Sequence, residues 1–152
     1  MAKMTLHGEY DEGSGDASNW GTDDIRGATG WSRLVDGTFN VRIEGPHTLR
    51  PDFHLARGDR NPAYAHTHEH LDFERCILLL PGGARVPALI ARTSNNFWGP
   101  SVLEVMAEEH LRSHYALAKG DCIDVEVWIG DHAAAEAEAA MASHRLTSDD
   151  RY

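Results

Sequence analysis

The sequence is poor in basic residues, and it lacks any long apolar run. Its 14 lysines and arginines are outnumbered by 24 aspartates and glutamates, which gives a formal net charge of −10. A chain of this charge repels nucleic-acid backbones and anionic membranes, so we expect neither as a partner. No apolar run approaches the length needed to cross a bilayer, and no signal peptide opens the chain. We therefore expect a cytoplasmic protein.

Cysteine is also scarce, and the composition predicts one small domain. Cys76 and Cys122 each stand in an apolar, strand-like stretch, so we expect both to be reduced core residues. A chain of 152 residues, 41% of them hydrophobic, can supply one core but not two enzyme domains. We expect the domain to cover residues 1–130. Residues 131–152 would form an acidic, alanine-rich helical tail, weakly anchored because Met141 is the one large apolar residue between His132 and His144.

Alternation of apolar and polar residues predicts a mostly β domain. The strands are expected at residues 4–10, 37–44, 76–80, 86–91, 102–106 and 122–128. The sequence Pro81-Gly82-Gly83-Ala84 predicts the turn of a hairpin between two of them. One helix is expected inside the domain, over residues 107–115.

Two small polar side chains, Thr38 and Asn40, stand at the start of one predicted strand, within Asp36–Glu44. Because strand side chains alternate between faces, both would point to the same side and could meet on one ion. A hydroxyl and an amide carbonyl are uncharged oxygen ligands, which suit Mg²⁺ when a nucleotide supplies the anionic ligands. The alternative is a polar turn that leads into an ordinary strand.

A glycine-rich stretch precedes this strand, from Gly8 to Asp16. Gly13 and Gly15 permit positive backbone dihedrals and a close approach of amide groups to a phosphate. The stretch lacks the lysine of a P-loop and the full dinucleotide-binding pattern, so a hairpin turn is the alternative.

A third stretch, Val102–Arg112 followed by Leu117–Val127, predicts a strand, a short helix, a turn and a strand. Taken in order with the two earlier stretches, the chain resembles the archaeal-type CTP-dependent riboflavin kinases over about residues 6–127. The shared motifs are a glycine-rich loop, a Gly-Thr-x-Asn strand, a strand ending in glutamate and alanine, a Leu-Arg pair and a closing Gly-Asp turn. The resemblance implies a small six-stranded barrel of the cradle-loop type, with one short helix and here a helical C-terminal tail. It also implies Mg²⁺-dependent transfer of the γ-phosphate of CTP to the 5′-hydroxyl of riboflavin, giving FMN and CDP.

The same resemblance implies roles for single residues. Thr38 and Asn40 would hold Mg²⁺, and Glu104 would contact the flavin. Counting back from Glu104 places a second flavin contact at Asn96, or at Thr93 if three residues are inserted. The residues expected to contact the nucleotide are Ser14, Gly15, Asp16, Ala17, Ser18, Asn19, Glu109, His110, Leu111 and Arg112. No catalytic residue is assigned. Asp16 is a possible base, with a turn-capping acid as the alternative.

The chain departs from the family pattern at three places. Ala17 stands where a glycine is expected, which changes the geometry available to the nucleotide loop. Glu108 stands where a proline is common and adds a negative charge that Arg112 offsets in part. The segment 47–72 is unlike the family and is expected to be an inserted or remodelled loop. A non-catalytic flavin- or nucleotide-binding protein on the same barrel is therefore an alternative function.

A histidine cluster offers a further alternative, a metalloprotein. His66, His68 and His70 alternate, with Glu69 between them and His54 upstream. On a strand, alternate histidines share one face and could ligate Zn²⁺ or Ni²⁺, with Glu69 facing away. A solvated polar loop is the other interpretation. A metal bound there would favour a cupin-like protein, although the glycine-rich strand and later histidine typical of such a pocket are missing.

Overall fold

The computed structural model describes residues 2–11, 22–31, 34, 39–56, 70–94, 99–109 and 111–148. The strands in these segments are β1 (Lys3–Asp11), β2 (Phe39–Ile43), β3 (Phe53–Ala56), β4 (His70–Leu79), β5 (Arg85–Thr93), β6 (Val102–Ala107) and β7 (Cys122–Trp128). The helices are α1 (Thr22–Thr29), α3 (Leu111–His114) and α4 (Ala133–Ser148). None of the described helices is long and apolar enough to span a membrane.

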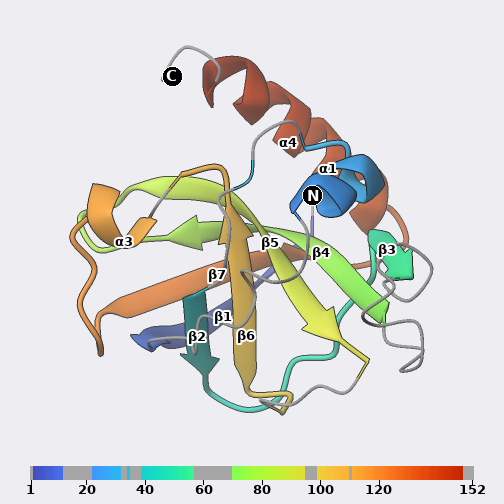
Figure 1. Cartoon of the computed structure of the whole chain (residues 1–152). Coiled ribbons are helices and arrows are strands. Elements are labelled where there is room, and N and C mark those ends of the chain that lie inside the picture. Colours follow the sequence, from blue (N-terminus) through green and yellow to red (C-terminus); the bar gives the residue numbers. More distant parts are fainter. Residues whose placement is uncertain are drawn as a thin grey trace.

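The strands form a closed antiparallel barrel, as the sequence predicted. Their order is β3-β4-β5-β6-β2-β1-β7, and a further pairing of β4 with β7 joins the two ends. This pairing closes β4, β5, β6, β2, β1 and β7 into a six-stranded ring and leaves β3 attached to the edge of β4 (Figure 1).

Strand β1 changes partners along its length, and Gly8 stands where the change occurs. Gly8 is paired with Ile43 of β2 on one side and with Ile123 of β7 on the other. A Cβ atom at this position would lie 2.8 Å from the backbone oxygen of Arg42. Glycine is therefore required here by the close approach of the neighbouring strand.

Alternate residues of the strands supply two separate cores. In β4, Cys76 and Leu78 face the barrel interior, where they pack with apolar residues from every strand of the ring. Leu71 and Phe73 face the opposite way. They form an outer core with residues of α1 and α4, which lie together on one side of the barrel (Figure 1).

The turn between β4 and β5 has the predicted hairpin geometry. The backbone amide of Leu80 donates to the oxygen of Ala84 at 2.9 Å, which closes the turn. Gly82 and Gly83 have φ angles of 88° and 92°, a region that other residues rarely adopt.

The helices differ from the prediction. The expectation of one helix inside the domain is wrong, because α1 covers the outer core with the fully buried Ile25, and α3 is a single turn. The expectation of a weakly anchored tail is also wrong. Ala133, Ala137 and Met141, spaced four residues apart, are all buried in the outer core. Alanine at these positions lets the helix approach the sheet closely, so a stripe of small residues anchors α4.

Three further expectations are wrong in detail. Strand β4 begins at His70 and not at Cys76, because Leu71 and Phe73 extend its buried face. The segment expected to be a remodelled loop contains strand β3. Cys122 is exposed at the start of β7, whereas Cys76 is buried as predicted; both thiols are free.

Candidate functional site

A row of polar residues crosses three neighbouring strands of the barrel. Asn40 of β2 is paired with Asp11 of β1 on one side and with Glu104 of β6 on the other. Directly opposite residues in antiparallel strands point to the same face of a sheet. The next residue of β2, Val41, faces the barrel interior, so the row of Asp11, Asn40 and Glu104 faces the outer side of the barrel wall. The structure thus makes neighbours of Asn40 and Glu104, which the sequence linked to Mg²⁺ and to the flavin.

Asn40 is a polar side chain with an unused acceptor. It is 3% exposed, and no hydrogen bond from the described part of the chain reaches its Oδ1 atom. A buried carbonyl oxygen without a partner costs about 1–3 kcal/mol. Native proteins retain few such groups, and those they retain commonly serve backbone strain, catalysis, or the binding of a water molecule or an ion. The amide oxygen of Asn40 is therefore a candidate for binding a ligand.

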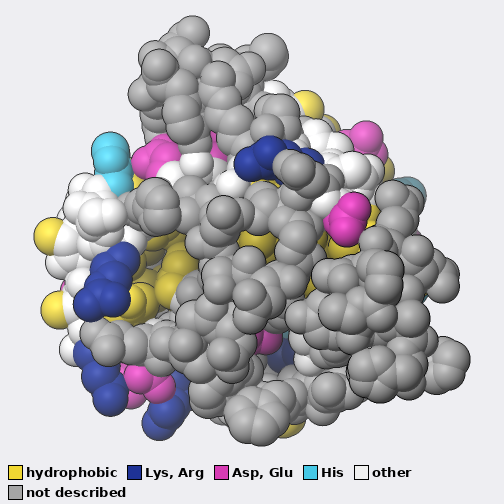
Figure 2. All heavy atoms as spheres, in the orientation of Figure 1, with side chains coloured by type: hydrophobic (Ala, Val, Ile, Leu, Met, Phe, Trp, Pro, Cys, Tyr) yellow, Lys and Arg dark blue, Asp and Glu magenta, His cyan; other side chains and the backbone are white. Residues whose placement is uncertain are grey.

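Two cations lie beside this row. Arg42 Nη2 donates to Asp11 Oδ2 at 2.7 Å, and Lys119 Nζ lies 3.7 Å from Asp11 Oδ1. The turn that carries Lys119 is fixed to β1, because the amide of Gly120 donates to the oxygen of Tyr10 at 2.8 Å. A pocket of about 290 Å³ lies here, lined by Glu9, Tyr10, Asp11, Arg42, Lys119 and Gly120. Figure 2 shows Lys and Arg side chains next to Asp and Glu side chains at the lower left, the region where Figure 1 places β1 and β2.

The remaining predicted site residues fall into two groups. Glu109, Leu111 and Arg112 follow β6 directly, and Glu109 Oε2 lies 3.5 Å from His114 Nε2. The side chain of Leu111 packs in the interior core, so only its backbone is available to a nucleotide. The others lie outside the described residues: Ser14, Gly15, Asp16, Ala17, Ser18, Asn19, Thr38, Asn96 and His110. Their predicted roles stay predictions.

Sequence reasoning missed a buried ionic group at His47 and Glu74. His47 Nε2 donates to Glu74 Oε1 at 2.7 Å, and the two side chains are 5% and 1% exposed. The backbone amide of Arg50 donates to the same oxygen at 3.3 Å, and Arg50 Nη2 donates to Asp52 Oδ2 at 3.1 Å. Each buried carboxylate thus has charged or polar partners, as burial of a charge requires.

The same group borders a pocket of about 320 Å³ between the loop after β2 and the adjoining ends of β1 and β7. Its lining residues are Met4, Pro46, His47, Thr48, Arg50, Glu74, Val127, Trp128, Ile129 and Gly130. Arg92 Nη1 donates to the backbone oxygen of His47 at 2.6 Å. Burial lowers the pKa of the Arg92 guanidinium, and the carboxylates of Glu74 and Glu104 act in the opposite direction. His47 and Glu74 already bind each other and neighbouring groups of the protein. We therefore assign the pair a structural role, in which it holds the loop after β2 against the barrel.

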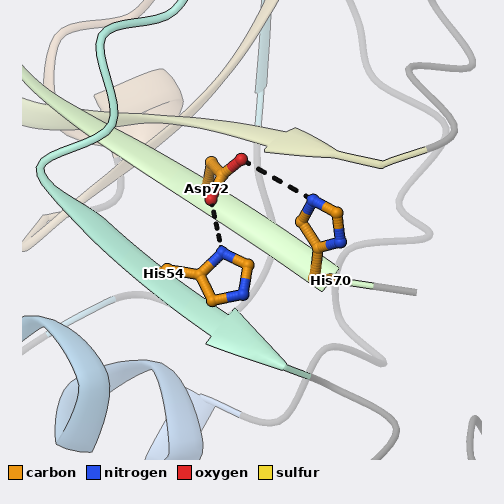
Figure 3. Close-up of side chains that lie close together, drawn as sticks. All are labelled: His54, His70 and Asp72. Carbon is orange, nitrogen blue, oxygen red and sulfur yellow. Dashed lines mark hydrogen bonds and ion pairs between the residues drawn. The ribbon is translucent and has the colours of Figure 1, made fainter. Parts of the chain in front are cut away.

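A second cluster lies on the β3–β4 hairpin. The carboxylate of Asp72 of β4 faces the imidazole rings of both His54 of β3 and His70 of β4 (Figure 3). His54 Nδ1 donates to Asp72 Oδ1 at 2.6 Å, and His70 Nε2 lies 3.7 Å from Asp72 Oδ2. The sequence singled out both histidines but not the aspartate. His66, His68 and Glu69 lie outside the described residues.

Comparison with known proteins adds no family assignment. No protein-family model and no curated protein sequence matches the chain significantly. Any function must therefore be argued from the ordered motifs, the barrel and the geometry of these sites.

Proposed function

We propose that this protein is a Mg²⁺-dependent phosphotransferase that moves the γ-phosphate of CTP to the 5′-hydroxyl of riboflavin, giving FMN and CDP. The observation that carries the proposal is the buried, unpartnered amide oxygen of Asn40, in the barrel that the family resemblance implies. In the reaction, the bond between the γ-phosphorus and its bridging oxygen breaks, and a bond to the riboflavin oxygen forms. The proton of the hydroxyl group leaves to solvent or to a base.

The donor chemistry of Asn40 fits a magnesium ion. An amide oxygen is a hard, uncharged ligand, and Mg²⁺ is commonly held by one or two protein oxygens together with substrate phosphates and water. Asn40 would hold the ion with Thr38, the partner that the resemblance implies. When bound, the ion would neutralise charge on the phosphoryl group, which is most of what phosphoryl transfer requires besides positioning.

The charges around Asn40 support a metal requirement. Asp11 and Glu104 flank it on the neighbouring strands, so a triphosphate would meet two carboxylates there. Arg42 and Lys119 offset the charge of Asp11 and offer cations to a phosphate at the pocket beside the row. Glu104, one strand away, would accept a hydrogen bond from the flavin and so orient it. We therefore expect nucleotide binding to be weak without a divalent cation.

The direct test is an assay of FMN formation. The purified protein is incubated with riboflavin, Mg²⁺ and each of the four nucleoside triphosphates, and FMN is followed by chromatography. FMN formed with CTP above the other nucleotides would support the reaction. The absence of FMN with every nucleotide, together with retained flavin or nucleotide binding, would favour the non-catalytic binding protein that Ala17 and Glu108 suggest.

Variants test the site itself. The double variant Thr38→Val and Asn40→Leu should abolish transfer, because it removes both predicted metal ligands. The matched control is Thr29→Val, which removes a buried hydroxyl in helix α1, a helix that contains no predicted site residue. Unaltered turnover in the double variant would contradict the site assignment, whatever the nucleotide preference.

A further inference from the structure

The cluster of His54, His70 and Asp72 is formed by strand pairing. His54 is directly opposite Asp72, and His70 is opposite Ala56, two positions further along the same two strands. Because side chains two residues apart in a strand share a face, all three point to the same side of the hairpin. The two imidazole rings have centroids 4.8 Å apart.

The spacing of the donor atoms suits a metal ion. One donor atom from each residue can be chosen so that all lie within 4.8 Å of one another. Bonds of about 2.0–2.2 Å to Zn²⁺ place neighbouring ligand atoms of a tetrahedral site roughly 3.3 Å apart. The observed separations from Asp72 oxygens, 2.6 Å to His54 Nδ1 and 3.7 Å to His70 Nε2, lie on either side of that value. Small side-chain rotations, with the Nδ1 proton of His54 released or moved to Nε2, would therefore create the site.

We propose that His54, His70 and Asp72 bind a divalent transition-metal ion, with Zn²⁺ as the first candidate. Two imidazoles and one carboxylate are borderline ligands that favour Zn²⁺ over Mg²⁺, which prefers oxygen ligands alone. Three protein ligands leave a coordination position for water or a substrate atom, as in catalytic rather than structural zinc sites. His54 is 57% exposed, so such a ligand can approach from solvent.

This site is separate from the proposed magnesium site. Strands β5 and β6 lie between β4, which carries Asp72, and β2, which carries Asn40. Three strand spacings correspond to about 14 Å along the sheet. One ion cannot serve both groups, so the metal proposal does not depend on the phosphotransferase.

The test measures zinc binding by the full-length protein. Protein freed of metal with a chelator is titrated with Zn²⁺ alone by calorimetry, and the bound metal is counted by mass spectrometry after dialysis. The Co²⁺-loaded protein gives a visible absorption spectrum that reports nitrogen and oxygen ligands. We expect one tightly bound Zn²⁺ per chain. We expect at least about tenfold weaker binding in each of His54→Ala, His70→Ala and Asp72→Asn, since loss of even a supporting residue costs that much.

The chain offers a matched control in His7, whose Nδ1 atom lies 3.1 Å from Asp124 Oδ1. This pair is also exposed, but the described residues supply no third donor there. His7→Ala should therefore leave zinc binding unchanged. Circular dichroism and melting temperature check that each variant folds.

Two results would overturn the proposal. One is that the wild type binds zinc no more tightly than His54→Ala does. Asp72 would then be only a hydrogen-bond acceptor for the two histidines. The other is loss of binding in His66→Ala or His68→Ala with full binding in His54→Ala, which would assign the metal to the alternating histidines instead.

Discussion

Replacement of Asn40 by leucine should stabilise the protein while it abolishes the proposed activity. The two side chains share the same branched shape, although leucine is the larger, and the substitution removes a buried oxygen that has no partner in the described structure. An unsatisfied buried acceptor costs about 1–3 kcal/mol, so its loss should raise the free energy of unfolding by roughly that amount, less any cost of repacking. For a chain of this size, 1 kcal/mol corresponds to about 2–4 °C in melting temperature.

The matched control for this prediction is a buried polar residue whose hydrogen bonds are made. Thr29 Oγ1 donates to the oxygen of Ile25 at 2.8 Å and accepts from the amide of Trp31 at 3.3 Å. Thr29→Val has nearly the same shape but removes both of these hydrogen bonds, so it should destabilise by about 1–2 kcal/mol. Urea denaturation of both variants without metal or nucleotide should therefore give shifts of opposite sign.

Ligand addition separates a binding role from a structural one. Mg²⁺ with CTP should raise the melting temperature of the wild type, because a ligand that binds the folded state alone stabilises it. The Asn40→Leu variant should show no such rise. If Asn40→Leu lowers stability as much as Thr29→Val does, the amide is a structural group, and the argument from its unused oxygen fails.

Other parts of the structure give four further predictions. Glu74→Ala leaves His47 without its buried partner and should lower the free energy of unfolding by about 3–5 kcal/mol, measured by urea denaturation; a loss under 1 kcal/mol would contradict the assigned structural role. Burial raises the pKa of the Cys76 thiol, so a thiol reagent should modify only Cys122 in the folded protein and both residues in denaturant. Stability should decline as the pH rises above the ordinary thiol pKa of about 8.5, since only the unfolded state then loses the Cys76 proton. Gly8→Ala should cost about 1–3 kcal/mol in a melting experiment, because the added methyl group would lie 2.8 Å from a strand backbone; an unchanged melting temperature would show that β1 relaxes.

The strands were predictable where apolar residues alternate without interruption. Strand β7 has the predicted bounds, because Ile123, Val125 and Val127 alternate with polar residues and all face the interior. Strand β4 extends beyond its prediction because its first residues alternate histidine and aspartate with Leu71 and Phe73, which makes the stretch look like a polar loop.

The helices were harder to predict from local sequence, because they depend on contacts with the rest of the fold. Helix α1 has Ile25 as its one large apolar residue, and a short segment of this kind is helical because it covers the outer core. The helicity of α4 follows from alanine propensity, but its anchoring depends on the sheet that meets Ala133 and Ala137. The sequence of each helix alone predicts neither of these contacts.

The sequence names residues of the candidate site one by one but does not predict their arrangement. The resemblance singles out Asn40 and Glu104 separately, and only the register of β2 against β6 makes them neighbours. His47 and Glu74 are 27 residues apart in sequence, so their hydrogen bond left no local signal. Asp72 was missed for the same reason: it meets His54 only because β3 pairs with β4.

The two proposed metal sites illustrate how one barrel can separate two ions by donor chemistry. At Asn40 the wall supplies a neutral oxygen, and the neighbouring Asp11 carboxylate already pairs with Arg42 and Lys119, so an ion there would draw on the anionic oxygens of a nucleotide. At His54, His70 and Asp72 the protein supplies two nitrogens and a charge of its own, so a transition metal needs no substrate to bind. Occupancy of the first site should therefore depend on nucleotide, whereas occupancy of the second should not. Binding of each metal measured with and without CTP thus tests both assignments on the same sample.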